Sequence, residues 1–468
     1  MFAKIQRIHF VGIGGVGMSG IAEVLLNLGY KISGSDLRNS AVTQRLAALG
    51  ASTFEGHAAV NIARADVVVT SSAISGDNSE IAEARRLHVP VIQRAEMLAE
   101  LMRLKYGIAI AGMHGKTTTT SMVAAVLAAG GLDPTVVVGG RVDAMGSNAR
   151  LGKSQYLVAE ADESDRSFLK LSPILSVVTN IDREHMDCYR DMRDVRRTFL
   201  EFMERVPFYG MVVGCNDDAV LRRLLPRVHR RVTTYGTSRG SDFLIRMGSS
   251  PVKSSLAAGE RGPLIRFQVT YKEKNLGEFT LHVPGTHNVL NATAAIAVGT
   301  ALDIPAEQIR SALDGFRGVD RRFQLKGKAA GVSVIDDYGH HPTEIRATLA
   351  AARQCGFRRV HVIFQPHRFT RTRDLMDEFT TAFADADTVC LLDIYPASEQ
   401  PIESITAEAL ASRIAGAGKL GVAYAPSFSE AVATVAALAQ PGDMVLTLGA
   451  GSVSQLGSMI LEKLETRS

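Results

Sequence analysis

The sequence predicts an α/β protein with three domains, each built on a mainly parallel sheet. Apolar runs of about four to eight residues alternate with longer helical segments through most of the chain, as strands and crossover helices do. A length of 468 residues is too great for one core and predicts about three domains of roughly 150 residues each. Changes in the pattern near residues 103 and 318 give the domains 1–103, 104–318 and 319–468.

Composition excludes several other classes of protein. Hydrophobic residues make up 46% and charged residues 21%, which is typical of a globular chain. A net charge of +4, from 52 basic and 48 acidic residues, is too small to indicate nucleic-acid binding. We find no apolar leader and no apolar run of about 18 residues, so we expect a cytoplasmic protein without membrane insertion. Four distant cysteines without C-x-x-C spacing predict buried free thiols: Cys188, Cys215, Cys355 and Cys390.

In the first domain, the apolar run "IHFVGI" leads into a glycine-rich turn. Gly12, Gly14 and Gly17 form the pattern G-x-G-x-x-G, in which a phosphate approaches the backbone at a helix start. Asp36 ends the next predicted strand, "KISGSD", where such folds place an acidic residue for a ribose. The pattern favours a bound nucleotide without saying which, because we recognise no hydride-transfer site beside it.

The second domain opens with a stronger signal. The strand "GIAIA" is followed by G-x-x-G-K-T and a helix, which is typical of a loop that binds a nucleoside triphosphate. Lys116 would contact the outer phosphates, and the Thr117 hydroxyl would bind Mg²⁺. The loop is shorter than usual, since Ile110 stands where the usual pattern has its first glycine.

Three further segments of this domain contain candidate site residues. In "VAEADESD", Glu160 lies closest to the apolar run and is the predicted carboxylate ligand of Mg²⁺, although acids in such a loop are often only solvated. His185, in "TNIDREHMD", is either structural or a contact to metal or phosphate. Asn288 and Asn291, three apart at a helix start, are either caps or amides that bind adenine. A β-rich pattern at 240–283 predicts a small antiparallel insertion.

In the third domain, two strands end in polar sequences, "DDYGHHPTE" and "FQPHRFTRT". Ligands of open α/β sheets bind at the carboxyl ends of the strands. A concentration of acidic, basic and imidazole side chains at two such ends therefore indicates a site, and its members are Asp337, His340, His341, His367, Arg368 and Arg371.

Taken in order, these motifs resemble those of the Mur ligases, the ATP-dependent enzymes that build the peptide stem of bacterial peptidoglycan. The resemblance covers essentially the whole chain, and it is strongest to the members that join L-alanine to the lactyl carboxylate of UDP-N-acetylmuramate through an acyl phosphate. It implies a Rossmann-like UDP-sugar domain, a P-loop ATPase domain and a Rossmann-like domain for the amino acid. It also implies ATP as co-substrate and Mg²⁺ as cofactor.

The resemblance assigns roles to individual residues. Catalysis would involve Lys116, Glu160 and His185, and the metal ligands would be Thr117, Glu160 and His185. The UDP-sugar would contact Gly12, Gly14, Gly15, Gly17, Asp36 and Ser71. ATP would contact Gly112, His114, Gly115, Lys116, Thr117, Thr118, Asn288, Asn291, Arg322 and Asp337. L-Alanine would contact Tyr338, His340, Arg368 and Arg371.

One departure from the family and two alternatives remain. Several sibling ligases have a carbamylated lysine near the metal, but no lysine occurs here between Leu171 and Val252, so another group must take that part. The chain could instead attach a whole tripeptide to the same sugar nucleotide. A nicotinamide-dependent oxidoreductase with an accessory ATPase domain is the third reading. We expect small-molecule partners only and a monomer or weak homodimer.

Overall fold

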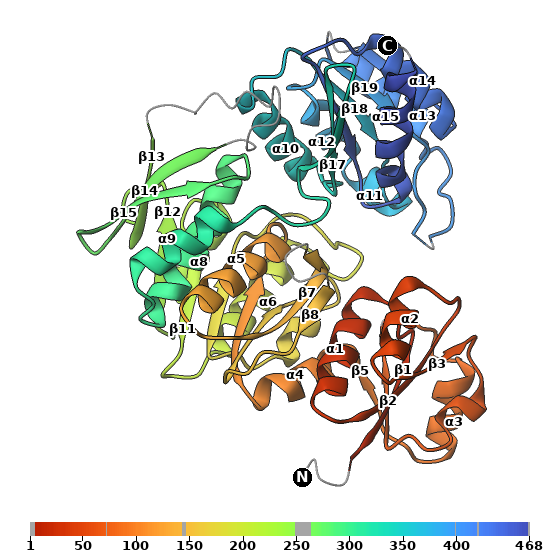
Figure 1. Ribbon diagram of the computed structural model, residues 1–468, viewed down its shortest axis with the longest axis vertical. Helices are drawn as coiled ribbons and strands as arrows, with labels where there is room; N and C mark the ends of the chain where they lie inside the picture. The colour runs from red at the N-terminus through yellow and green to blue at the C-terminus, as the bar shows by residue number, and fades with distance from the viewer. Residues whose placement is uncertain are drawn as a thin grey trace. The chain divides into compact units, whose positions relative to one another are not determined.

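The computed structural model describes residues 5–71, 73–142, 147–248, 264–397, 399–418 and 421–466. Three mainly parallel sheets with helices between the strands form an α/β fold, as predicted (Figure 1). The chain forms two compact units, 1–246 with 268–279 and 290–313, and 247–267 with 280–289 and 314–468. The three-domain boundaries at 103 and 318 stay a prediction.

The first sheet belongs to the first unit and has five parallel strands in the order β3-β2-β1-β4-β5. This order is that of a Rossmann-like half, and it places the end of β1 at the point where the chain changes direction across the sheet. Its elements are β1 Arg7–Val11, α1 Val16–Asn27, β2 Lys31–Asp36, α2 Ala41–Ala48, β3 Ser52–Glu55, η2 Ala59–Ile62, β4 Val67–Thr70, α3 Ser79–Arg86, β5 Val91–Gln93 and α4 Arg94–Arg103.

Local sequence explains the helix starts of this sheet. Ser40 and Thr43 form a capping box at α2, and the Asn78 side chain accepts hydrogen bonds from the first turn of α3. One face of the sheet is closed by a small apolar core, made of Val11, Ile62, Val68, Ile81 and Ala84.

The second sheet has ten strands in the order β15-β14-β13-β12-β11-β10-β6-β9-β7-β8. Its central strand β6 (Tyr106–Ala111) runs parallel to its two neighbours, β9 (Tyr156–Glu160) and β10 (Leu175–Val178). The carboxyl ends of these three strands therefore meet at one edge. The remaining elements are α5 Lys116–Ala129, β7 Thr135–Val142, β8 Ser147–Arg150, η4 Ser167–Lys170, α6 Met192–Glu204, β11 Met211–Cys215, α7 Ala219–Leu224, η5 Leu225–Arg227, β12 Val232–Gly236, β13 Phe243–Met247, β14 Ile265–Tyr271, β15 Lys274–Leu281, α8 Thr286–Ala301 and α9 Ala306–Gly315.

The predicted antiparallel insertion at 240–283 is only partly right. Its first strand, β13, pairs in parallel with β12. The neighbouring strands β14 and β15 are joined by a two-residue turn in which Lys272 and Glu273 both have positive φ, 46° and 67°. Such a turn is typical of a hairpin. Residues 249–263 of the predicted insertion lie outside the described residues.

The third sheet belongs to the second unit and has six strands in the order β16-β17-β21-β18-β19-β20. Only β16 is antiparallel to its neighbour among the described pairings. Two apolar cores cover its faces, one including Ile345 and Leu349 of α10 and the other Val432 of α14 and Ile460 of α15. Its elements are β16 Gln324–Ala329, β17 Val332–Asp337, α10 Pro342–Gln354, β18 Val360–Phe364, α11 Phe369–Asp374, α12 Met376–Ala382, β19 Thr388–Leu391, α13 Ala407–Gly416, β20 Gly421–Tyr424, α14 Phe428–Leu438, β21 Met444–Leu448, η6 Ser452–Gln455 and α15 Leu456–Glu465.

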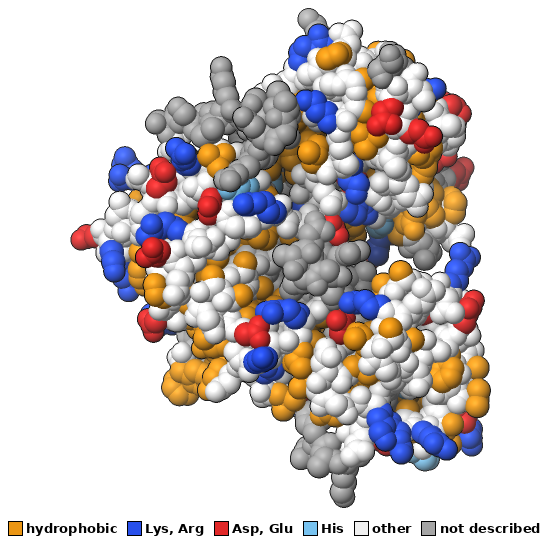
Figure 2. All heavy atoms as spheres, viewed as in Figure 1, with side chains coloured by type: hydrophobic (Ala, Val, Ile, Leu, Met, Phe, Trp, Pro, Cys, Tyr) orange, Lys and Arg blue, Asp and Glu red, His pale blue; other side chains and the backbone are white. Residues whose placement is uncertain are grey.

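The surface and the cysteines largely agree with the composition. Figure 2 shows basic and acidic side chains intermixed on the face it draws. Among the described residues, no helix is both long and apolar enough to cross a membrane. All four cysteines are free, and three are buried as predicted; Cys188 is only partly buried, which corrects that part of the prediction, because it lies in the loop between β10 and α6.

Candidate functional site

The predicted triphosphate loop connects β6 to α5 and depends on two glycines. Gly112 has φ +128°, and a Cβ there would overlap the Thr179 hydroxyl. Gly115 has φ +83°, and a Cβ there would lie 2.7 Å from Oδ1 of Asn291. Both positions favour glycine by conformation and by space. The loop ends where α5 begins at Lys116, so its backbone N–H groups lie at a helix N-terminus.

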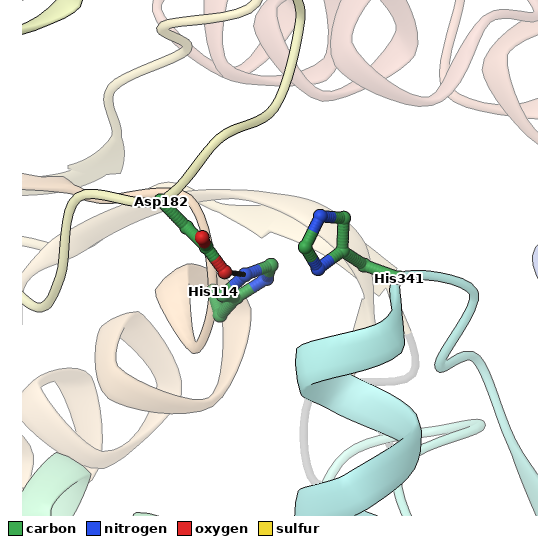
Figure 3. Close-up of side chains that lie close together, drawn as sticks. All are labelled: His114, Asp182 and His341. Carbon is green, nitrogen blue, oxygen red and sulfur yellow. Dashed lines mark hydrogen bonds and ion pairs between the residues drawn. The ribbon is translucent and has the colours of Figure 1, made fainter. Parts of the chain in front are cut away.

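The segment after β10 holds this loop from the side. The His114 N–H donates to Asn180 Oδ1 at 2.9 Å, and Thr179 Oγ1 donates to the His114 carbonyl at 2.7 Å. The His114 ring Nε2 lies 3.0 Å from Asp182 Oδ2 (Figure 3). These contacts exist because β6 and β10 are parallel neighbours, so that their carboxyl-terminal loops meet.

Lys116, which is partly exposed, forms an ion pair with the buried Glu163, a residue that the sequence did not single out. Its ammonium donates to Glu163 Oε1 at 2.6 Å and to the carbonyls of Gly112 at 2.7 Å and Met113 at 3.2 Å. The Glu163 side chain is 1% exposed. Burial raises the pKa of Glu163 to about 7, and the Lys116 charge offsets part of that rise. Burial disfavours the charged form of Lys116, but Glu163 and neighbouring acids raise its pKa above the ordinary value.

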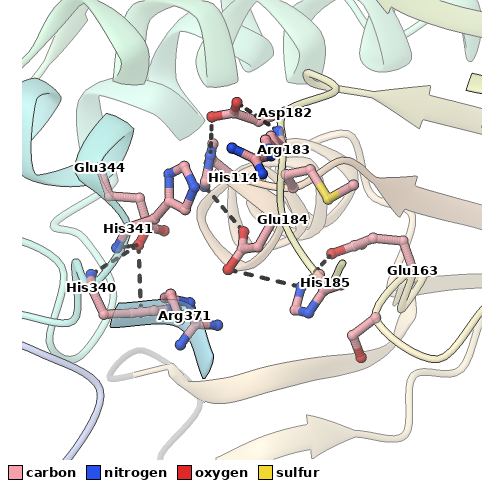
Figure 4. Close-up of polar contacts among 12 residues, drawn as sticks. His114, Glu163, Asp182, Arg183, Glu184, His185, His340, His341, Glu344 and Arg371 are labelled. Atoms are coloured by element: carbon pink, nitrogen blue, oxygen red, sulfur yellow. Dashed lines mark hydrogen bonds and ion pairs between the residues drawn. The ribbon is translucent and has the colours of Figure 1, made fainter. Parts of the chain in front are cut away.

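His185 lies beside the same carboxylate. Its Nε2 is 3.7 Å from Glu163 Oε1 and 3.9 Å from Glu184 Oε1 (Figure 4). The residue has φ 56°, a left-handed conformation that is uncommon outside glycine. Its carbonyl accepts from the N–H groups of Cys188 and Tyr189, which form the next turn and fix the histidine in place. The structure thus brings Lys116 and His185 to one carboxylate.

Oxygen donors of the kind that Mg²⁺ prefers lie at the carboxyl ends of these strands, and the structure brings one of them, the Glu163 carboxylate, to within 3.7 Å of His185 Nε2. Glu160 is the last residue of β9, beside Ile110 of β6, and Thr117 lies in the first turn of α5. Buried Oε2 of Glu163 has no hydrogen-bond partner among the described residues. Mg²⁺ prefers oxygen ligands, which a hydroxyl and carboxylates supply.

Asn288 and Asn291 occupy the first turns of α8 and are both buried. Asn291 Oδ1 accepts from the Thr119 hydroxyl at 3.1 Å, which places this amide against the triphosphate loop helix. Asn288 Nδ2 donates to the Pro284 carbonyl at 2.7 Å, so that this side chain helps to fix the start of its own helix. Thr118, predicted to contact ATP, is buried in the first turn of α5.

The first glycine loop lies at the end of β1. The Gly12 and Ile13 N–H groups donate to the Ser35 carbonyl at 2.8 and 2.9 Å, and Gly14 N–H donates to Asp36 Oδ2 at 2.9 Å. Asp36 therefore supports the turn itself. Nearby, a cavity of about 400 Å³ opens at the ends of β4 and β5. It is lined by Thr70, Ser71, Ile74, Gly76, Ile81, Arg85, Val89, Val91 and Gln93, and so includes the predicted Ser71.

The third sheet presents its polar residues at the carboxyl end of β17. Asp337 is buried; its Oδ2 accepts from the Phe323 N–H at 2.7 Å and its Oδ1 from the Gly339 N–H at 2.8 Å. Burial raises the pKa of Asp337. Arg321 and Arg322 both lie over the Tyr338 ring, with guanidinium carbons 5.0 and 5.2 Å from its centre. The predicted residues Arg322, Asp337 and Tyr338 thus belong to one cluster within the second unit.

The remaining predicted residues of this unit lie at the starts of α10 and α11. The backbone N–H groups of His340 and His341 donate to Glu344 Oε2 at 3.0 and 3.3 Å (Figure 4). The His341 ring caps α10 by accepting from the Thr343 N–H, a structural role that spacing alone did not predict.

At α11, Arg371 Nη1 lies 3.0 Å from the His367 ring and donates to the His367 carbonyl at 3.1 Å. Arg368 directly precedes the helix with φ 71°, and its N–H donates to the Tyr395 carbonyl at 2.8 Å.

Several residues of these clusters were missed by sequence reasoning. Glu163 is one of four acids in the segment "EADESD", and only the turn after β9 shows which one meets Lys116. Arg321 precedes the predicted Arg322 and pairs with Asp336 at 3.0 Å. Tyr395 stacks on His367 with ring centres 5.5 Å apart, although no motif marks it.

Family models match nearly the whole chain. The model described as "Mur ligase family, catalytic domain" matches residues 7–106, "Mur ligase middle domain" matches 110–299, and "Mur ligase, glutamate ligase domain" matches 321–451.

Curated relatives are similar over the full length. A UDP-N-acetylmuramate–L-alanine ligase of Koribacter versatilis is 72% identical over 100% of this chain and 99% of its own. One from Acidobacterium capsulatum is 64% identical with the same coverage. A solved UDP-N-acetylmuramate–alanine ligase of Thermotoga maritima superposes with TM-score 0.80 at 29% identity, over 99% of this chain and 100% of that one. The motifs, the sheet orders and these similarities together show that the chain belongs to the Mur ligase family.

Proposed function

We propose that this chain joins L-alanine to the lactyl carboxylate of UDP-N-acetylmuramate, using ATP and an acyl-phosphate intermediate, as a step of peptidoglycan precursor synthesis. The ion pair between Lys116 and the buried Glu163 at the glycine loop is the observation that supports it most, in a chain 72% identical to an L-alanine ligase. The enzyme would act in the cytoplasm on small molecules, as a monomer or weak homodimer.

Lys116 would bind the outer phosphates of ATP while the lactyl carboxylate attacks the γ-phosphate and ADP leaves. An ammonium group has three N–H donors, and all three are used here by Gly112, Met113 and Glu163. Phosphate binding must therefore displace at least one of these contacts. Releasing Glu163 leaves its carboxyl group buried beside His185, ready to take a proton or a cation. The amine of L-alanine then attacks the acyl phosphate, and phosphate leaves.

Mg²⁺ would be held by Thr117, Glu160 and His185, and the Glu163 carboxylate lies beside His185. When bound, Mg²⁺ offsets the repulsion between the anionic nucleophile and the triphosphate. Glu163 would also take the place of the carbamylated lysine that several sibling ligases have near the metal, because its carboxylate lies 3.7 Å from His185.

The other substrates would occupy the remaining clusters. Gly12, Gly14, Gly15 and Gly17 would bind the UDP pyrophosphate, with Asp36 and Ser71 nearby, and the cavity lined by Ser71 would take part of the nucleotide. Asn288, Asn291, Arg322 and Asp337 would contact ATP together with Gly112, His114, Gly115 and Thr118 of the loop. L-Alanine would meet Tyr338, His340, Arg368 and Arg371.

Phosphate release tests the proposal directly. Purified protein with UDP-N-acetylmuramate, ATP and Mg²⁺ should release phosphate when L-alanine is added, and less with L-Ala-D-Glu-meso-diaminopimelate at the same concentration. Calorimetry should detect UDP-N-acetylmuramate binding and no tight NAD binding. Faster turnover with the tripeptide would indicate the recycling ligase, and tight NAD binding without a response to the sugar nucleotide would indicate the oxidoreductase.

A further inference from the structure

One arginine of the first unit lies between the helix that follows the first glycine loop and the acidic turn beside the second. Arg94 is the first residue of α4, directly after β5. Its Nη2 donates to Asp162 Oδ2 at 3.0 Å. A Cβ on Gly17 would lie 2.8 Å from Nη1 of the same guanidinium, so Arg94 also lies against the first turn of α1, which follows the glycine loop of β1. A single side chain thus connects the glycine-loop helix with the acidic turn after β9.

Asp162 links this arginine to the catalytic lysine. Its Oδ1 accepts from the Ser164 N–H at 3.0 Å and from the Ser164 hydroxyl at 2.7 Å, and its carbonyl accepts from the Phe168 N–H at 3.0 Å. Asp162 therefore shapes the turn in which the next residue, Glu163, pairs with Lys116. The connection runs from Gly17 through Arg94 and Asp162 to the triphosphate loop.

A second ion pair joins α4 to η4, which follows the turn that contains Asp162, and it provides a comparison. Glu96, one turn into α4, pairs with Lys170 of η4 at 2.9 Å. Its side chains are 43% and 38% exposed, against 24% and 38% for Arg94 and Asp162. The described contacts of Lys170 include neither glycine loop. If these pairs only attach α4 to the neighbouring segment, breaking either pair should have the same effect on activity. If the Arg94–Asp162 pair positions the two loops, only breaking that pair should lower activity.

We infer that the Arg94–Asp162 pair is a positioning device that sets the distance between the nucleotide-sugar loop and the triphosphate loop. The inference rests on the proposed function, in which the two loops hold the two reacting anions. Reacting atoms must come within about 3–3.5 Å, and a misplacement of about 1 Å costs roughly 10²-fold in rate. A planar guanidinium held between two segments fixes such a geometry better than a flexible ammonium does.

The test compares Arg94→Gln, Arg94→Lys and Asp162→Asn with Lys170→Gln as the matched control. Arg94→Gln and Asp162→Asn should each lower kcat by about 10²-fold. Separately measured affinities for UDP-N-acetylmuramate and for a non-hydrolysable ATP analogue should stay near wild type. Arg94→Lys should recover part of the rate, and the double variant Arg94→Gln with Asp162→Asn should be no slower than either single variant, because the two residues act as a unit. Lys170→Gln should keep the wild-type kcat.

Three outcomes would overturn the inference. If Lys170→Gln lost as much kcat and thermal stability as Arg94→Gln does, the Arg94–Asp162 pair would only attach α4 to its neighbour. A weaker affinity for UDP-N-acetylmuramate with unchanged kcat would make Arg94 a substrate contact instead. Additive losses of kcat in the double variant would show that Arg94 and Asp162 act independently. Failure of the proposed function is distinct, because the wild-type protein would then release no phosphate in response to L-alanine.

Discussion

The Lys116–Glu163 pair makes a prediction at the scale of single residues. Lys116→Met should lower kcat by about 10²- to 10³-fold, since under the proposed function it removes a charge that would stabilise the transferred phosphate. It should also destabilise the fold by about 3–5 kcal/mol, because Glu163 is left buried without its partner. Adding Glu163→Gln to this variant should restore stability without restoring activity. Urea unfolding and phosphate release measure the two effects, and a single variant as stable as wild type would contradict the buried pair.

A second buried carboxylate predicts a pH dependence. Glu80 accepts from Ser35 Oγ at 2.5 Å and from Asn61 Nδ2 at 2.6 Å, and it lies 3.5 Å from the His9 ring. Burial opposes its ionisation, but these partners lower its pKa from 4.5 to about 2. A lowered pKa means stability that is present above pH 4.5 and lost as pH falls toward about 2. At 1.36 kcal/mol per unit, the contribution is about 3 kcal/mol at most.

Glu80→Gln should therefore be less stable than wild type near neutral pH, and the difference should shrink as pH falls through this window. Chemical unfolding at a series of pH values measures it. Glu83→Gln is the control in the same helix, because its carboxylate pairs with Arg86 at the surface, where such a pair contributes little. If the difference in unfolding free energy between Glu80→Gln and wild type did not change with pH, ionised Glu80 would not be the source of the stability.

Residue identity was predictable where a backbone or a phosphate demands one residue type. Gly112 and Gly115 follow from the motif, and the structure gives both a positive φ. Glu163 could not be selected, because spacing within "EADESD" does not say how the chain turns after β9. His341 was grouped with the site residues, and the structure adds that its ring caps α10, which the spacing did not show. Which partner a polar side chain meets depends on the neighbouring loops, and those are set by sheet order.

At the scale of elements, the loop between β6 and α5 predicts a strong effect of one methyl group. Gly112→Ala should cost about 2–5 kcal/mol or shift the loop, because φ is +128° and the Cβ would overlap the Thr179 hydroxyl. Phosphate release should fall with it. Gly315→Ala, at the end of α9, is the control, since its Cβ would meet nothing within 4 Å. Thermal unfolding should show that only the first variant is destabilised; equal effects would show that the loop tolerates a side chain.

Long apolar strands and capped helices were predictable, and short edge strands were not. β1, β6, β17 and β21 are buried runs that the alternation indicated directly. The strand β3 has only four residues, mostly exposed, so it has no apolar run to detect. The parallel pairing of β13 with β12 could not be predicted either. The periodicity of hydrophobic residues indicates that a segment is a strand, but it does not indicate the strand's direction.

At the scale of the whole molecule, two glycine loops in one chain agree with a reaction between two anionic substrates. Fold class was predictable from alternation, and family membership from the joint order of the motifs. Under the proposed function, a few side chains of the second unit would select the amine. Arg371 is fixed by His367, and Arg368 is held at the start of α11 by the Tyr395 carbonyl. A guanidinium held in fixed geometry suits the carboxylate of a small amino acid.

Arg368→Ala and Arg371→Ala should each raise the L-alanine KM by about 30-fold or more, because losing a charged contact that bound substrate would cover costs about 2–5 kcal/mol. The KM values for ATP and UDP-N-acetylmuramate should change little. Arg373→Ala is the control on the same helix, since Arg373 is exposed and pairs with Asp374 at 2.7 Å. Glycine lacks one methyl, worth about 1–3 kcal/mol, and should remain a poor but measurable substrate. Steady-state kinetics on L-alanine, glycine and L-Ala-D-Glu-meso-diaminopimelate measure these differences. A higher kcat/KM for the tripeptide than for L-alanine would assign this chain to tripeptide recycling, because the arginines would then anchor a longer peptide.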